Sequence, residues 1–295
     1  MLWLILGLIS GFSFALYHIA NKKYIKSANP TYFAYWVLFF TAIFAFPFIF
    51  ILWEHLVLNK MTIFFMVLLG VVIVITRPMY LHALKISNVS KTAPLLTLTP
   101  LLTLILAMIT LREFPSSLGI VGVILLVAGT YFLNYSPKQH KHILEPFTLI
   151  FKHKGSQLMF IVAVVYGFGS VIDKNIVLNS NHITRLVLYS FIALPMFTAY
   201  LMFKDGCSKY VKETKFTFKE HWKGIILTTL IFYCVIIPQV WAYTMTYTAY
   251  VISLKRTAAI FTVIIAYFAF KEKKNFWYIL FGTMLMVLGV VLMIL

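Results

Sequence analysis

The chain has 295 residues, of which 62% are hydrophobic and 11% charged, and its formal net charge is +17. Soluble proteins keep about a quarter of their residues charged, so this composition excludes an ordinary soluble protein and indicates that lipid surrounds most of the chain. The lysines flank apolar runs and form no basic helix or aromatic-basic patch, which favours a role in membrane topology over nucleic-acid binding. Two cysteines, Cys207 and Cys234, indicate neither a disulfide framework nor a metal site.

Apolar windows of roughly 20 residues, the length that crosses a bilayer, recur along the chain with short polar breaks. The first, MLWLILGLISGFSFALYHIANKK, lacks the basic leading region and the cleavage site of a secretory signal, so we interpret it as a retained helix. The predicted spans are residues 2–20, 31–53, 62–84, 90–111, 117–135, 156–178, 184–203, 224–247, 250–270 and 276–294. The sequence therefore predicts an all-α polytopic membrane protein with ten transmembrane helices and both termini on one side.

Two long connections, 136–155 and 204–223, interrupt this series, and the first separates residues 1–135 from 156–295. Its ILEPFTLIF segment is equally consistent with an interfacial segment and with a solvated linker. Aligning Glu113 with Glu272 brings the fourth and ninth helices into register, and one inserted residue downstream aligns Gly122 and Gly129 with Gly282 and Gly289. Each half has an odd number of helices, so the second must be inverted relative to the first. We interpret the glycines as sites of close helix packing.

Three motifs carry a resemblance: ALKISNVSKTAPL at the end of helix 3, LREFPSSLGIVG after helix 4 and FKEK before helix 10. They are similar to motifs of the EamA-type members of the drug/metabolite transporter superfamily, and the resemblance covers essentially the whole chain. It implies two five-helix EamA-like repeats, 1–135 and 156–295, and transport of a small-molecule solute across a lipid bilayer without a cofactor. It does not imply which solute, because a fold does not determine its cargo.

Ionisable residues inside predicted spans are functional candidates, because a charge in hydrocarbon needs a partner or a wet cavity. Asp173, Lys255 and Arg256 fall at one level, near the side that holds the termini, and we expect them to meet there, with Tyr243 close by. Arg77 falls nearer the opposite side. Residues His18, His82 and Lys91 form a second cluster with Arg77.

Each candidate also has a purely structural interpretation. Lys174 and the second cluster's His18, His82 and Lys91 are close enough to helix ends to reach the headgroups. Asp173 is also consistent with a fixed bridge to Arg256, and Tyr243 with an interfacial belt residue. Thr97 and Pro100 lie on the fourth helix, where contact with substrate and simple helix bending are equally consistent with the sequence.

The LKRTAAIF stretch is the sharpest signal. Lys255 and Arg256 are adjacent, hence about 100° apart around a helix, so one partner cannot satisfy both and an anionic ligand would help. The pair looks like the phosphate-gripping Lys-Arg pair of the plastid sugar-phosphate branch of the superfamily. That branch has a helix 4 lysine four residues before a proline, whereas Leu96 precedes Pro100 here. A carboxylate, or a zwitterion whose amine is held by Asp173, fits equally well. In a third alternative the two cations bind no substrate and only set the electrostatic potential of a cavity.

These observations predict a secondary transporter of an anionic or zwitterionic metabolite, working by alternating access in the cell membrane. Asp173 and His18 are the candidate proton carriers, and uniport or exchange is an equal alternative. A lipid-linked-sugar flippase, or a subunit of one, is the alternative function. The chain contains no phosphate loop, HExxH or aspartate-rich diphosphate motif, so we expect neither an enzyme nor a metal site. A homodimer is a further expectation.

The orientation rests on charge. Most of the 25 lysine and arginine residues fall in the loops that follow odd-numbered helices, and only Lys60, Arg112 and Arg185 fall in loops on the other side. The positive-inside rule then places both termini outside the cytoplasm. The family resemblance implies cytoplasmic termini, and we favour the charge bias.

Overall fold

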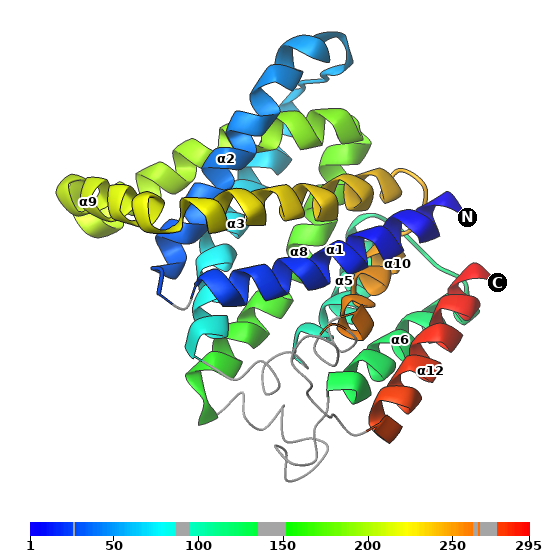
Figure 1. Cartoon of the computed structure of the whole chain (residues 1–295). Helices are drawn as coiled ribbons and strands as arrows, with labels where there is room; N and C mark the ends of the chain where they lie inside the picture. Colours follow the sequence, from blue (N-terminus) through cyan, green and yellow to red (C-terminus); the bar gives the residue numbers. More distant parts are fainter. Residues whose placement is uncertain (26, 87–94, 135–151, 262–264, 266–275) are drawn as a thin grey trace.

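A computed structural model describes residues 1–25, 27–86, 95–134, 152–261, 265 and 276–295, and Figure 1 shows its course from the N-terminus in blue to the C-terminus in red. The described part is helical throughout. Its elements are α1 (Leu2–Tyr24), α2 (Pro30–Ile51), the 3-10 turn η1 (Trp53–His55), α3 (Lys60–Ile86), α5 (Thr99–Thr110), α6 (Ser117–Asn134), α8 (Lys154–Asn179), α9 (His182–Ala242), α10 (Thr248–Lys255) and α12 (Phe276–Ile294).

Five of these helices are long and apolar enough to cross a membrane, namely α1, α2, α3, α8 and α9, and α5, α6 and α12 are shorter apolar helices. The predicted spans 90–111 and 250–270, and the linker 136–155, extend into residues outside the described part. The total of ten transmembrane helices therefore stays a prediction, while the all-helical membrane class is confirmed.

Local sequence signals set several helix boundaries. At α2 the Asn29 side chain accepts a hydrogen bond from the Thr31 backbone N–H at 3.1 Å, and Pro30 occupies the first helical position. An Asn cap followed by proline is a strong helix start, because proline has no N–H to leave unpaired. The predicted start at residue 31 is therefore one residue late.

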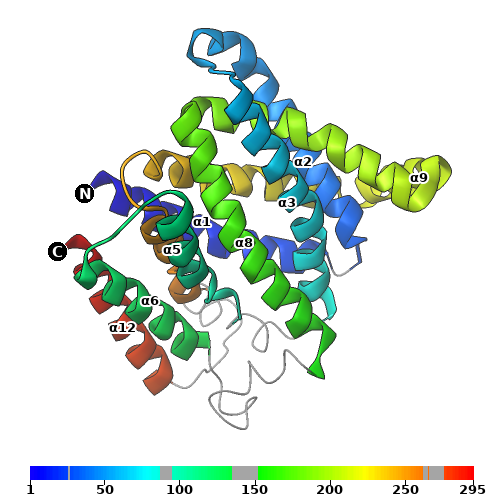
Figure 2. The ribbon, with the colours of Figure 1, turned by 180° about the vertical axis from the view of Figure 1, so that it is seen from behind.

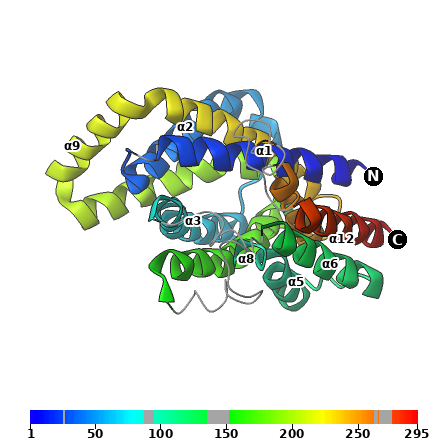
Figure 3. The same ribbon diagram turned by 60° about the horizontal axis from the view of Figure 1, so that its bottom comes forward.

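The stretch 204–223, predicted as a long connection between two spans, is itself largely helical. Helix α9 runs from His182 to Ala242, and its backbone departs from helical geometry at Gly206, with φ 76° and ψ 156°. The stretch contains six lysines and two glutamates, which are good helix formers, and glycine adopts that positive φ without strain. The chain consequently turns back as a helical hairpin, which projects from the body of the molecule in Figures 1 and 3.

The hairpin is fastened to α2. The Tyr32 hydroxyl donates to Asp205 Oδ2 at 3.0 Å, and the Trp36 indole N–H donates to the Thr214 carbonyl at 2.9 Å. The indole of Trp36 also lies 4.6 Å from the ring centre of Phe218. These contacts hold the lysine-rich part of α9 against α2.

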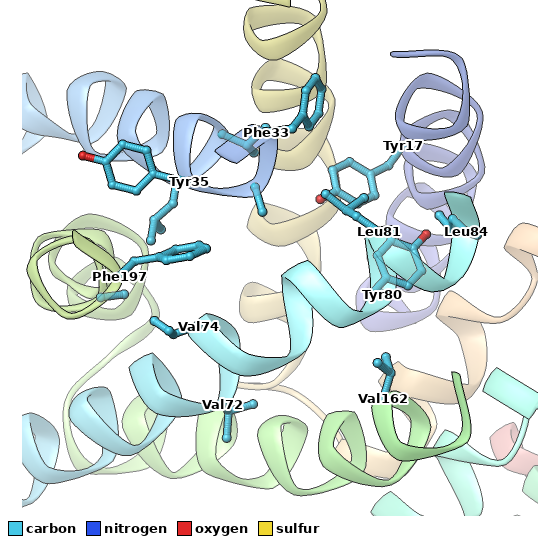
Figure 4. Packing of buried hydrophobic residues seen from close by; sticks show 14 of the residues in the cluster. Tyr17, Phe33, Tyr35, Val72, Val74, Tyr80, Leu81, Leu84, Val162 and Phe197 are labelled. Carbon is cyan, nitrogen blue, oxygen red and sulfur yellow. The ribbon is translucent and has the colours of Figure 1, made fainter. Parts of the chain in front are cut away.

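The two halves of the chain are interleaved. Helices α1 and α2 pack against α9, α3 packs against α8, and α10 packs against α1 and α5, as Figures 1 and 2 show from opposite sides. Figure 4 shows part of the core that results: Tyr35 of α2 meets Phe197 of α9 edge to face, with ring centres 5.8 Å apart. The most extensive helix–helix contacts in the described part therefore join the first half to the second.

The last helices of the two halves, α6 and α12, lie side by side in Figures 1 and 2. A Cβ atom added to Gly129 would lie 2.5 Å from the carbonyl oxygen of Gly282, and one added to Gly122 would lie 2.6 Å from that of Gly289. The prediction of close packing at the glycines is confirmed. The residues that are equivalent in sequence, Gly122 and Gly282, sit at opposite ends of the contact, because the two helices run antiparallel as an inverted repeat requires.

Candidate functional site

The Lys-Arg pair lies where the ninth predicted helix is interrupted. Helix α10 ends at Lys255, residues 256–257 form a turn, and residues 258–261 are helical again. The Thr257 hydroxyl donates to the Leu254 carbonyl at 2.7 Å, which satisfies an acceptor at the helix end. Arg256 is 8% exposed and Thr257 4%, so protein covers the irregular backbone, as membrane depth requires.

The fourth predicted helix is interrupted at the equivalent place. Residues 95–96 are helical, 97–98 form a turn, and α5 begins at Thr99 with Pro100 in its first turn. The alignment that places Glu113 on Glu272 places Thr97 on Arg256. Thr97 and Pro100 are both buried at this break. The two repeats thus share a break, and only the second repeat carries a cation there.

Lys255 is held by neutral groups. Its Nζ donates to the side-chain oxygen of Gln239 at 2.7 Å and lies 4.4 Å from the ring centre of Phe14. The Gln239 amide in turn donates to the buried hydroxyl of Tyr243 at 3.0 Å. An amide oxygen and an aromatic face stabilise an ammonium group but leave its charge uncompensated.

Two buried guanidinium groups have unused donors. Arg256 Nε and both terminal nitrogens of Arg77 have no hydrogen-bond partner among the described residues. Arg77 is 5% exposed, and its guanidinium carbon lies 4.3 Å from the ring centre of Phe232. A buried donor without a partner costs about 1–3 kcal/mol, and more when it is charged. Both arginines therefore have N–H donors available for a hydrogen-bond acceptor.

The carboxylate of Asp173 is engaged by Arg185 and forms no hydrogen bond or ion pair with Lys255 or Arg256 among the described residues, so the expected meeting of the three stays a prediction. Arg185 Nε donates to Asp173 Oδ1, and its Nη2 lies 3.3 Å from Oδ2. Both residues are buried, and the Arg185 guanidinium also lies 4.5 Å from the ring centre of Tyr189. Only residues 180–181 separate α8 from α9, so the antiparallel helices bring the two residues together. The sequence pattern had placed Arg185 among loop cations.

Lys174 is likewise not at the headgroups. It is 7% exposed, its Nζ lies 3.4 Å from Glu113 Oε1, and it donates to the carbonyls of Tyr243 and Thr246. Glu113 also accepts the backbone N–H of Thr248 at 2.7 Å and its hydroxyl at 3.0 Å. These contacts of Glu113 join the first half of the chain to α8 and α10 of the second half.

His18 lies beside Phe14, the ring that also lies against Lys255. Its Nδ1 shares a hydrogen bond with the Tyr80 hydroxyl, and its ring meets Phe14 edge to face at 4.4 Å. Figure 4 shows Tyr80 of α3 next to Tyr17 of α1. Proton coupling by His18 or Asp173 stays a prediction. No group of three His, Cys, Asp or Glu side chains suited to a metal ion occurs in the described ranges.

Sequence comparison bears on the class of the protein. Residues 1–135 and 153–295 both match the EamA-like transporter family. The chain belongs to that family. The family resemblance expected from the sequence is therefore confirmed, and with it the inverted-repeat architecture, a solute as cargo and a multi-pass membrane location. The family is in general not enzymatic.

Structure comparison supports the fold alone. A solved structure described as "Crystal structure of protein" has a TM-score of 0.68 to this EamA-like chain at 13% sequence identity. The alignment covers 99% of this chain and 94% of the other. No curated protein matches the chain.

Proposed function

We propose that this EamA-like transporter is a secondary transporter of a small organic anion, which binds at Lys255 and Arg256 and is carried by alternating access. The single observation that carries the proposal is the charge of the interior. Asp173 is matched by Arg185, and Glu113 by Lys174, whereas no salt bridge to Lys255, Arg256 or Arg77 forms among the described residues. A positive interior of low polarity favours an anion strongly.

The engaged carboxylate of Asp173 bears on the zwitterion alternative. A bound amine would need a free acid near Lys255, whereas the buried Asp173 and the partly buried Glu113 already hold Arg185 and Lys174. The proposal therefore favours a carboxylate or phosphate anion over a zwitterion. Arginine binds either oxyanion with its planar fork, and lysine adds a compact charge beside it.

A thermal-shift experiment tests the proposal. Purified protein is heated with a panel of metabolite anions, amino acids and cations, and the same panel is applied to Lys255→Gln and Arg256→Gln. A ligand at 100 times its Kd stabilises the folded state by about 2.7 kcal/mol, so the anion that binds raises Tm in the wild type. We expect that rise to disappear in both variants.

Arg112→Gln is the matched control, because Arg112 is exposed and is not part of the proposed site at Lys255 and Arg256. Arg112→Gln should show the same anion-dependent rise in Tm as the wild type. If no anion raises the Tm of the wild type, or if the anion raises the Tm of Arg256→Gln as much as that of Arg112→Gln, the proposal is wrong. A lipid-linked sugar that raises Tm where free anions do not would favour the flippase alternative.

We further propose that the protein resides in the cell membrane with its termini outside. Cys207 reports on this, because it is exposed beside the bend of α9, on the lysine-rich side. In a Cys234→Ser background we expect Cys207 to resist a membrane-impermeant maleimide in intact cells and to react after permeabilisation. A Leu58→Cys control in a chain without the native cysteines should react in intact cells, since Leu58 is exposed in the opposite connection. Labelling of Cys207 in intact cells would reverse the orientation.

A further inference from the structure

Arg77 is a buried cation whose position the anion site at Lys255 and Arg256 does not explain. It belongs to α3 in the first half of the chain and is 5% exposed. Its guanidinium carbon lies over the ring of Phe232, yet both terminal nitrogens lack a hydrogen-bond partner among the described residues. A ring face offsets part of the charge but accepts none of these N–H bonds in the way an oxygen does.

Arg77 and Lys255 lie against one row of aromatic rings from opposite repeats. Phe14, which lies against Lys255, stacks on Tyr17 with ring centres 6.1 Å apart. Tyr17 in turn lies 5.9 Å from Phe232, the ring against which Arg77 lies, between ring centres. Three neighbouring rings therefore connect the site at Lys255 with Arg77.

We propose that the solute is a dianion, with one anionic group on Lys255 and Arg256 and the second on Arg77. This inference rests on the proposed function and deepens it. The buried Arg77 and Arg256 and the partly buried Lys255 form no salt bridge in the described part, and together they would retain a charge of two with a monoanion and of one with a dianion. Each added anionic group also supplies oxygen acceptors to donors that otherwise stay unpaired.

The surroundings of the cations indicate what joins the two anionic groups. Phe14 lies against Lys255, Phe232 lies against Arg77, and Tyr17 lies between the two phenylalanines. The faces of these rings pack well against carbon, and the phenylalanines offer no conventional hydrogen-bond partner to a hydroxyl group. The class of solute that fits is a short carbon skeleton with an anionic group at each end, such as a small dicarboxylate.

The test compares monocarboxylates with dicarboxylates of the same carbon number, propionate with malonate and butyrate with succinate, at equal ionic strength. Apparent Kd values are taken from the ligand dependence of Tm for the wild type, Arg77→Gln and Arg112→Gln. In the wild type we expect a dicarboxylate to bind roughly tenfold or more tightly than its monocarboxylate. Arg77→Gln should remove that preference and leave the monocarboxylate Kd within about twofold, and Arg112→Gln should keep it.

Arg77→Lys provides a second variant, since it retains the charge and loses the planar fork. We expect it to keep part of the preference, and it serves the same comparison if Arg77→Gln fails to fold. Equal binding of mono- and dicarboxylates by the wild type, or equal weakening of both by the Arg77 variants, overturns the dianion proposal and leaves the anion transporter standing. If no carboxylate or other anion raises Tm, the proposed function fails as well.

Discussion

Asp173→Asn is expected to lower the free energy of unfolding by about 3–5 kcal/mol, because it leaves the Arg185 guanidinium buried without its counter-charge. The Asp173 and Arg185 side chains are only 6% and 5% exposed, so water cannot replace the lost carboxylate. The measurement is the unfolding midpoint of purified protein in mixed detergent micelles. The effect is on stability, since the described contacts of Asp173 are with Arg185 and not with Lys255 or Arg256.

Two variants make this prediction specific. Asp173→Asn combined with Arg185→Met removes both charges, and we expect it to recover most of the loss, since an apolar replacement of a buried ion pair is often neutral. Lys209→Gln is the exposed control, because the Lys209 side chain that pairs with Asp205 is 59% exposed, and a surface pair contributes about 0–1 kcal/mol. Equal destabilisation by Asp173→Asn and Lys209→Gln would contradict the buried role of Asp173.

Gly129→Val is expected to destabilise the protein by about 1–3 kcal/mol or more by forcing α6 and α12 apart. A Cβ at this position lies 2.5 Å from the carbonyl oxygen of Gly282, a backbone atom that cannot rotate away. Gly129→Ala introduces the same Cβ with less bulk and should show a smaller loss in the same direction. The unfolding midpoint in mixed micelles again gives the measurement.

Val121→Leu is the control for this contact, because Val121 lies on α6 and its side chain is 44% exposed. A larger apolar group there meets lipid and should leave the midpoint within about 0.5 kcal/mol of the wild type. If Gly129→Val is as harmless as Val121→Leu, the close approach of α6 and α12 does not occur.

Hydropathy and repeat spacing predict most of the helical framework, because membrane depth leaves the backbone few alternatives to a helix. The predicted spans 117–135 and 276–294 lie within a residue of α6 and α12. The hairpin in α9 was missed, since a polar, lysine-rich stretch carries no hydropathy signal for a helix that lies outside hydrocarbon. The domain boundaries 1–135 and 156–295 stay predictions.

Of the candidate site, the sequence identifies the cations and not their partners. Lys255, Arg256 and Arg77 stand out because a charge in an apolar run is rare. Gln239 was missed, since a neutral amide gives no such signal, although it holds Lys255. The pairing of Asp173 with Arg185, and of Lys174 with Glu113, depends on how helices from distant segments face each other. The binding roles of Tyr243, Thr97 and Pro100 stay predictions.

The interleaving of the halves has a consequence for biosynthesis. Helix α6 leaves the ribosome well before α12, and until Gly282 and Gly289 are synthesised its glycine face lacks the partner it has in the finished molecule. The order in which the helices enter the membrane therefore differs from the order in which they can pack. Formation of this helix pair waits for residues 276–295, so a chain that stops before them leaves the glycine face of α6 without its partner.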